Sequence, residues 1–104
     1  MMLERVKLAM RISTDVFDSE LLALIAAGIA DIKHAGVDFD VSTTEDNGGN
    51  TTDYVIEDAL ASTAVVTYCR MMFGSPSDFD RLKVAYEMQK GQMRESRAYG
   101  MEAL

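Results

Sequence analysis

A long apolar stretch, from about Asp53 to Phe73, dominates the sequence and is followed by Gly74. Its apolar side chains recur at helical spacing around a wide arc: Val55, Ile56, Ala59, Leu60, Val65, Val66, Cys69, Met72 and Phe73. A helix that is apolar over so much of its circumference is usually buried on most sides. The stretch therefore predicts a central helix, with Val66 and Leu60 in the core.

Two shorter helices are predicted before this one. Residues 3–12 carry a brief helical period, and residues 18–35 carry a longer one, which Gly36 is placed to end in a left-handed conformation. The apolar stripe of the longer helix comprises Leu21, Leu22, Ile25, Ile29 and Ile32. Gly28 inside it costs about 1 kcal/mol relative to alanine, which predicts a close packing neighbour.

A fourth helix is predicted from residue 75 onward. Ser75 is placed to cap it, with Pro76 at the first helical position. Its apolar side chains form a narrow seam of the kind that lies against one or two partner helices. Residues 96–104 are predicted to be a C-terminal tail.

Residues 37–52 are rich in threonine, aspartate and glycine, and the turn formers at 47–50 indicate a break. We interpret this segment as a mobile acidic loop between the second and third helices. The whole pattern predicts an all-α fold, a small bundle of about four helices in a single domain that covers residues 1–104.

The charge and the rare residue types exclude several classes of function. Ten basic and seventeen acidic residues give a net charge of −7, which argues against a surface that binds DNA phosphates. One cysteine excludes an internal disulfide, and one histidine excludes a multi-histidine metal site. No stretch approaches the roughly 20 apolar residues of a membrane span, and no signal peptide is recognisable. We therefore expect the protein to be made and used in a reducing cytoplasm.

Three features of the sequence match a metal site or a catalytic site only in part. Residues 38–42 follow the first alternate positions of a calcium loop, but Thr43 and Gly49 stand where glycine and glutamate are needed. His34 has no nucleophile or orienting acid at a recognisable spacing. Cys69 lies on an apolar arc, where a cysteine behaves as a small hydrophobe. We therefore expect no enzyme activity, catalytic residue, cofactor or metal.

Several segments, taken in order, resemble small tailed-phage head–tail connector proteins. They are residues 3–12 (LERVKLAMRI), 17–21 (FDSEL), 27–36 (AGIADIKHAG), 64–74 (AVVTYCRMMFG) and 75–83 (SPSDFDRLK). The family is also labelled a DNA-packaging protein with a Gln-Leu-Arg-Gly signature. Residues 92–95 read Gln-Met-Arg-Glu here and keep two of those four positions. The likeness covers most of the chain outside residues 37–52.

The resemblance implies an all-helical structural protein of the virion. Such connectors form a ring under the portal by cyclic head-to-tail contacts between copies. The ring extends the DNA channel, with DNA only as its contents, and docks the next completion protein. We therefore expect the chain at the head–tail junction of a phage or prophage, after assembly in the host cytoplasm. Its expected partners are itself, the portal protein and a head-closure or tail protein, with no membrane.

A partner-binding site is expected in the fourth helix. The candidate residues are Phe79, Leu82, Tyr86, Gln92, Met93, Arg94 and Arg97. Past Gly91 a small domain leaves the seam little to pack against, and guanidinium groups there suit carboxylates on a partner. The resemblance locates the portal contact in the same C-terminal part. A chain ending at Lys90 is therefore expected to stay folded but not to bind the portal.

The sequence leaves two other functions open. A small helical regulatory or DNA-binding module would need a basic recognition helix, for which the fourth helix is the best candidate. A calcium- or anion-sensing domain would use the acidic loop.

Overall fold

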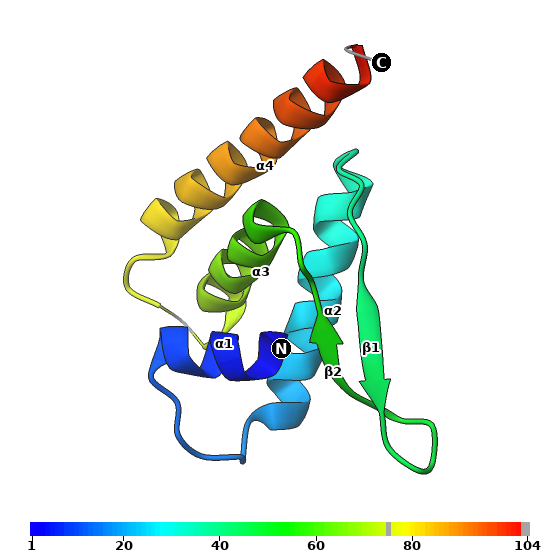
Figure 1. Cartoon of the computed structure of the whole chain (residues 1–104). Helices are drawn as coiled ribbons and strands as arrows, with labels where there is room; N and C mark the ends of the chain where they lie inside the picture. The colour runs from blue at the N-terminus through cyan, green and yellow to red at the C-terminus, as the bar shows by residue number, and fades with distance from the viewer. Residues whose placement is uncertain (75, 103–104) are drawn as a thin grey trace.

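The structure, a computed structural model, describes the backbone of residues 1–74 and 76–102 and the side chains of residues 1–74 and 76–95. Within those residues it contains four helices and a two-stranded antiparallel sheet. In chain order the elements are α1 (Met2–Met10), α2 (Asp18–His34), β1 (Ser42–Glu45), β2 (Thr51–Val55), α3 (Ala59–Met72) and α4 (Phe79–Glu102). In Figure 1, α3 lies between α4 and α2, and the β1–β2 hairpin lies on the other side of α2.

The hairpin makes the fold a mixture of helix and sheet, so the all-α prediction is wrong. Its turn is closed by Asp46, whose Oδ1 accepts hydrogen bonds from the backbone N–H of Gly48 (2.9 Å) and Asn50 (3.0 Å). The strands on each side are rich in β-branched threonine, which favours extended backbone. Across the strands, the hydroxyls of Thr44 and Thr52 hydrogen-bond at 2.7 Å.

Residues 37–52 are therefore not the long loop that the sequence suggested. Val37 and Phe39 are 2% and 6% exposed, and both belong to the hydrophobic core. The Lys33 ammonium lies 5.2 Å from the centre of the Phe39 ring, within the range of a cation–π contact. The segment thus enters the core before it becomes strand β1.

Helix α3 begins at Ala59 rather than near Asp53. Asp58 is its N-cap, and its Oδ1 accepts a hydrogen bond from the Ala61 N–H at 3.0 Å. The preceding residues form strand β2, in which Asp53 is buried. The apolar period over residues 53–56 thus belongs to a strand and its exit, not to a helical turn.

The core is centred on α2 and α3, which are packed together and covered by α1 and α4. Its buried apolar residues are Met2, Val6, Leu21, Ile25, Ile29, Ile32, Val37, Phe39, Ile56, Ala61, Ala64, Val65, Cys69, Met71, Leu82, Tyr86 and Met93. Leu60 is 48% exposed, so its predicted core position is wrong. Val66 is half-buried against the core, whereas its neighbour Val65 is fully buried.

Three glycines confirm what the sequence predicted of them. Gly36 and Gly74 follow helices with φ values of 97° and 66°, in the left-handed region that glycine adopts freely. A Cβ on Gly28 would lie 3.0 Å from Cδ1 of Tyr68, so a larger side chain there would require the Tyr68 ring to shift.

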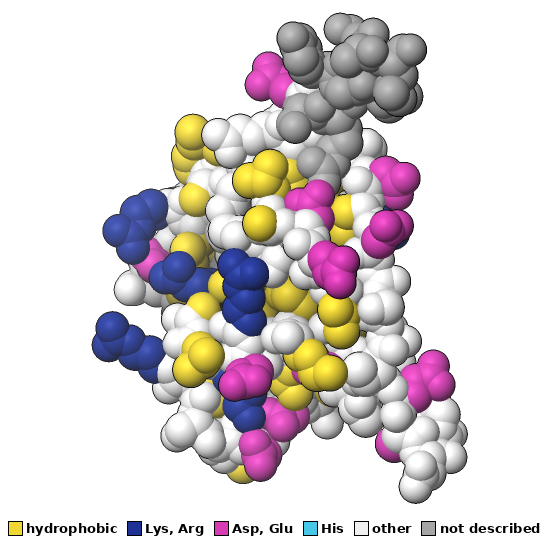
Figure 2. Space-filling model, in the orientation of Figure 1, with side chains coloured by type: hydrophobic (Ala, Val, Ile, Leu, Met, Phe, Trp, Pro, Cys, Tyr) yellow, Lys and Arg dark blue, Asp and Glu magenta, His cyan; other side chains and the backbone are white. Residues whose placement is uncertain are grey.

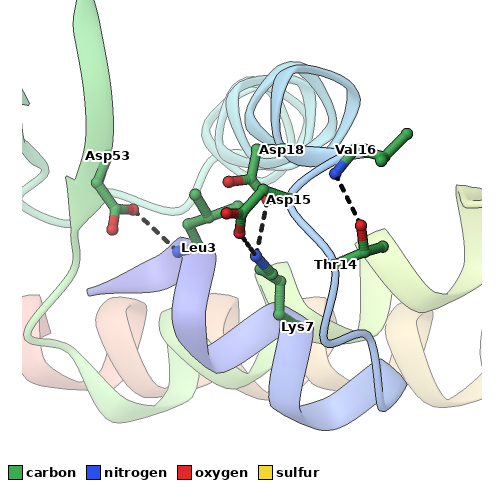
Figure 3. Close-up of polar contacts among 7 residues, drawn as sticks. All are labelled: Leu3, Lys7, Thr14, Asp15, Val16, Asp18 and Asp53. Carbon is green, nitrogen blue, oxygen red and sulfur yellow. Dashed lines mark hydrogen bonds and ion pairs between the residues drawn. The ribbon is translucent and has the colours of Figure 1, made fainter.

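Polar contacts hold α1 on two sides (Figure 3). The Leu3 N–H donates to Oδ1 of Asp53 at 2.9 Å, which satisfies a free N–H of the first turn and ties α1 to β2. The Lys7 ammonium donates to the carboxylates of Asp15 and Asp18, each at 2.9 Å, and so ties α1 to the start of α2. Because α1 has only nine residues, these tertiary contacts fix it in place.

Helix α4 corrects two predictions about the end of the chain. It begins at Phe79, so Pro76 precedes the helix instead of occupying its first position. Its backbone stays helical to Glu102, so the predicted tail from residue 96 continues the helix over most of its length. Ser75, the predicted cap, lies outside the described residues. A single Gly91 without a following proline does not end the helix.

Candidate functional site

The side chains considered as catalytic or metal-binding candidates do not come together in a reactive site. His34 is exposed at the end of α2. Cys69 is fully buried, and burial raises its thiol pKa to about 12, so the nucleophilic thiolate is scarce at neutral pH. Among the described residues, no three ligand-type side chains come together to hold a metal ion. In the same part of the chain, no helix has both the length and the apolar character needed to cross a bilayer.

The negative charge of the chain is concentrated beside the hairpin. Residues 37–58 contain seven acidic residues and no basic one, so this segment accounts for the whole net charge of −7. A shallow cleft of about 480 Å³ lies at the base of the hairpin, lined by Asp38, Phe39, Asp40, Val41, Ser42, Val55, Glu57 and Asp58. Figure 2 shows most Lys and Arg side chains of the visible face on its left half, and mainly Asp and Glu toward the hairpin on its right. On this face the basic and acidic side chains are therefore largely separated.

The predicted partner-binding residues of α4 divide into two groups. Leu82, Tyr86 and Met93 are 6%, 2% and 0% exposed, because they attach α4 to the rest of the domain. A partner reaches them only if α4 moves. The exposed group comprises Phe79, Gln92 and Arg94, and the side chain of Arg97 lies outside the described residues. Partner binding by these residues stays a prediction. Because Leu82, Tyr86 and Met93 are buried, the candidates are reduced to the exposed group.

A polar contact that the sequence did not predict joins α4 to α2. The Tyr86 hydroxyl donates to Oδ2 of Asp31 at 2.5 Å, and the Lys90 ammonium lies 3.2 Å from the same oxygen. Lys90 also lies over the Tyr86 ring, 4.6 Å from its centre. Burial and the neighbouring carboxylate raise the pKa of Tyr86, and the hydrogen bond from Tyr86 lowers the pKa of Asp31. The only signal in the sequence was Asp31 itself, an acidic residue in the last turns of α2, where the helix dipole favours basic ones.

Replacement of Asp31 with asparagine is expected to destabilise the domain by about 1 kcal/mol at neutral pH, because a charge-assisted hydrogen bond becomes a neutral one at a partly exposed site. The lowered folded-state pKa means that the carboxylate stabilises the fold above its unfolded pKa of about 4. This contribution is lost as the pH falls through the folded-state pKa. Urea unfolding of the native chain and Asp31→Asn should therefore differ at neutral pH and converge in acid. A difference that does not change with pH would contradict this account.

An apolar hollow of about 350 Å³ lies at the corner between α3 and α4, lined by Met71, Met72, Gly74, Pro76 and Phe79. Met72 is 45% and Phe79 39% exposed. Asp78 precedes Phe79 and pairs with Arg81 at 2.9 Å. The hydrogen bond from Arg81, with a smaller contribution from the charge of Arg70, lowers the pKa of Asp78. The hollow combines two helix ends and a turn, so no local spacing in the sequence indicated it.

The outward face of α4 carries a second apolar patch. Val84 and Met88, one helical turn apart, are 60% and 63% exposed. Two neighbouring exposed apolar side chains on one helix face are suited to contact with another protein.

Comparison with known families adds the functional class. A family model of phage connector proteins matches residues 2–100. Comparisons with curated proteins and with solved structures found no match. The matched range runs from α1 into the last turn of α4 and includes the hairpin, which the resemblance seen in the sequence had left out.

Proposed function

The chain belongs to the phage connector protein family, whose members are structural proteins of the head–tail junction, and from this premise we propose that it forms a ring under the portal. The ring extends the channel through which DNA passes and docks the next completion or tail protein. The chain thus acts by contact with other proteins and not by catalysis.

The family match over residues 2–100 is the single observation that carries this proposal. It spans α1 to α3, both strands and nearly all of α4, so the proposal concerns the whole domain and not a shared fragment. The apolar residues that remain exposed on α3 and α4 agree with it, because a connector needs surfaces for its neighbours.

The distribution of charge supports passage of DNA rather than binding. A channel wall must not hold phosphates, and acidic side chains beside the hairpin repel them. On the exposed face of α4, Arg81, Lys83 and Arg94 are balanced by Asp80, Glu87 and Glu95 and interrupted by Val84 and Met88. This mixed surface does not favour the alternative of a basic recognition helix.

We assign the portal contact to the distal part of α4. Gln92 and Arg94 are exposed there, beyond the contact between Lys90 and Asp31. An arginine on a helix surface suits bidentate pairing with carboxylates of a partner. Arg97 follows in the same helix and belongs to the same proposed contact.

The proposal is tested in a phage whose genome encodes this chain. Deletion of its gene is expected to give heads that contain DNA but carry no tails in electron micrographs, because the junction is incomplete. A plasmid copy of the native gene should restore infectious particles, and an empty plasmid should not. Tailed, infectious particles without the chain would overturn the proposal.

A further inference from the structure

Helix α3 carries an exposed apolar side chain near each of its ends. Leu60, in the first turn, is 48% exposed, and Met72, the last residue, is 45% exposed. They are twelve positions apart in the sequence, which corresponds to about 18 Å along a helix. The two side chains are therefore separate features on opposite ends of one rigid element.

The surroundings of these ends differ in shape. Met72 belongs to the apolar hollow with Met71, Pro76 and Phe79, which has room for a side chain from another molecule. Methionine adapts its shape to a bound apolar group, so the hollow tolerates small differences of fit. Leu60 lines none of the clefts described above and projects from the helix start.

The surroundings also differ in charge. Leu60 follows the acidic segment and lies three residues after the exposed Glu57. Close to the hollow in the chain, Arg81 pairs with Asp78, and the exposed Arg70 and Lys83 outnumber the exposed Asp80, so the local charge is weakly positive. The charge beside Leu60 is thus negative and the charge beside the Met72 hollow is positive, so the two ends of α3 are complementary in sign.

We propose that Leu60 of one copy inserts into the Met72 hollow of a second copy, with Glu57 facing the basic rim. This inference rests on the proposed ring and names its contact between copies. Because the two surfaces differ, each copy offers a free projection and a free hollow, so the contact repeats head-to-tail and closes when the rotation allows.

Disulfide trapping tests this contact in the full chain. Leu60 and Met72 of one copy are too far apart for a disulfide, so any bond between cysteines at these positions joins two copies. Native Cys69 lies three residues before position 72 in the same helix, close enough to pair with a cysteine there, so every variant in this experiment also carries Cys69→Ala. Assembled protein, concentrated alone or bound to portal-bearing heads, is oxidised mildly and separated on a denaturing gel.

The double variant L60C/M72C is expected to give a ladder of covalent oligomers. A mixture of the single variants L60C and M72C should give dimers, whereas each alone should give none. The matched control is a mixture of L8C and M72C, because Leu8 is 72% exposed but lies on α1. Rings of the expected mass without a ladder would overturn the contact and leave the proposed function standing. Dimers from L60C alone would also overturn it. If the native chain forms no oligomer, either alone or on portal-bearing heads, both proposals would be overturned.

Charge reversal gives a second, independent readout. Glu57→Arg is expected to weaken association between copies about tenfold, and Arg70→Glu in the same chain should recover most of the loss. Glu45→Arg, the same charge change on an exposed position of β1, is the control and should leave association unchanged. Equal loss in Glu57→Arg and Glu45→Arg, or no recovery by Arg70→Glu, would contradict the proposed pairing.

Discussion

Val65→Asp is expected to abolish the cooperative unfolding transition of this domain, whereas Val66→Asp, one residue along α3, is expected only to weaken it. Val65 has no exposed surface, and the substitution would leave an unpaired carboxylate in the core. Burial of such a charge costs several kcal/mol, and about 1.5–3 kcal/mol of apolar burial is lost as well. Together these costs approach the total stability of a small domain, about 5–15 kcal/mol.

The neighbouring position is a matched comparison. Val66 is half-buried, so its carboxylate would keep contact with water and cost about 1–2 kcal/mol. Leu60→Asp, at a surface position of the same helix, should change the free energy of unfolding by less than about 1 kcal/mol. Circular dichroism melts and urea titrations measure all three variants. A cooperative melt for Val65→Asp near that of the native chain would mean that α3 is not the centre of the core.

The sequence predicted those parts of the fold whose signals are local. Residues 18–35 combine a helical apolar stripe with a glycine stop, and α2 ends within one residue of that range. Gly28 predicted a close neighbour because a glycine inside a helix needs a steric reason, and Tyr68 supplies it. In the first case the signal lies within the helix and the residues that end it. In the second, the cost of a glycine inside a helix predicts that another residue packs closely against it.

The hairpin was missed because its signals overlap with those of other elements. Residues 53–56 combine apolar side chains at positions that fit either a helix start or a strand followed by a turn. The choice is made by tertiary contacts: Asp53 accepts the Leu3 N–H from α1, and Val37 and Phe39 enter the core. Such contacts join segments far apart in the chain, and a single sequence does not reveal them.

The candidate site was predicted only in part for the same reason. A seam on α4 was recognisable, but the sequence does not say whether it packs on its own domain or on a partner. Tyr86 and Met93 prove to be internal, and the contact between Asp31 and Tyr86 spans 55 residues. The apolar hollow draws on α3, the turn and α4 and leaves no spacing signal.

A chain ending at Glu95 is expected to stay folded and yet fail to complete heads. It keeps the buried Met93 and the contact of Lys90 with Asp31, so its melting temperature should remain within about 3 °C of the native value. It lacks Arg97 and the remainder of α4, which we assign to the portal contact. Its ability to restore infectious particles to a phage lacking the gene should therefore fall by orders of magnitude.

A chain ending at Lys90 separates folding from binding in this experiment. The sequence alone suggested that it would stay folded, but it loses Met93, a fully buried core side chain, at a cost of about 2–5 kcal/mol. Its failure to support assembly would reflect instability, whereas failure of the chain ending at Glu95 would reflect a missing contact. Arg94→Glu in the full chain extends the comparison, because it reverses one exposed charge and removes no packing. If the chain ending at Glu95 restores full infectivity, residues 96–104 do not contribute to the portal contact. If Arg94→Glu also restores full infectivity, the distal part of α4 does not bind the portal, and the contact must lie elsewhere on the surfaces formed by residues 1–95.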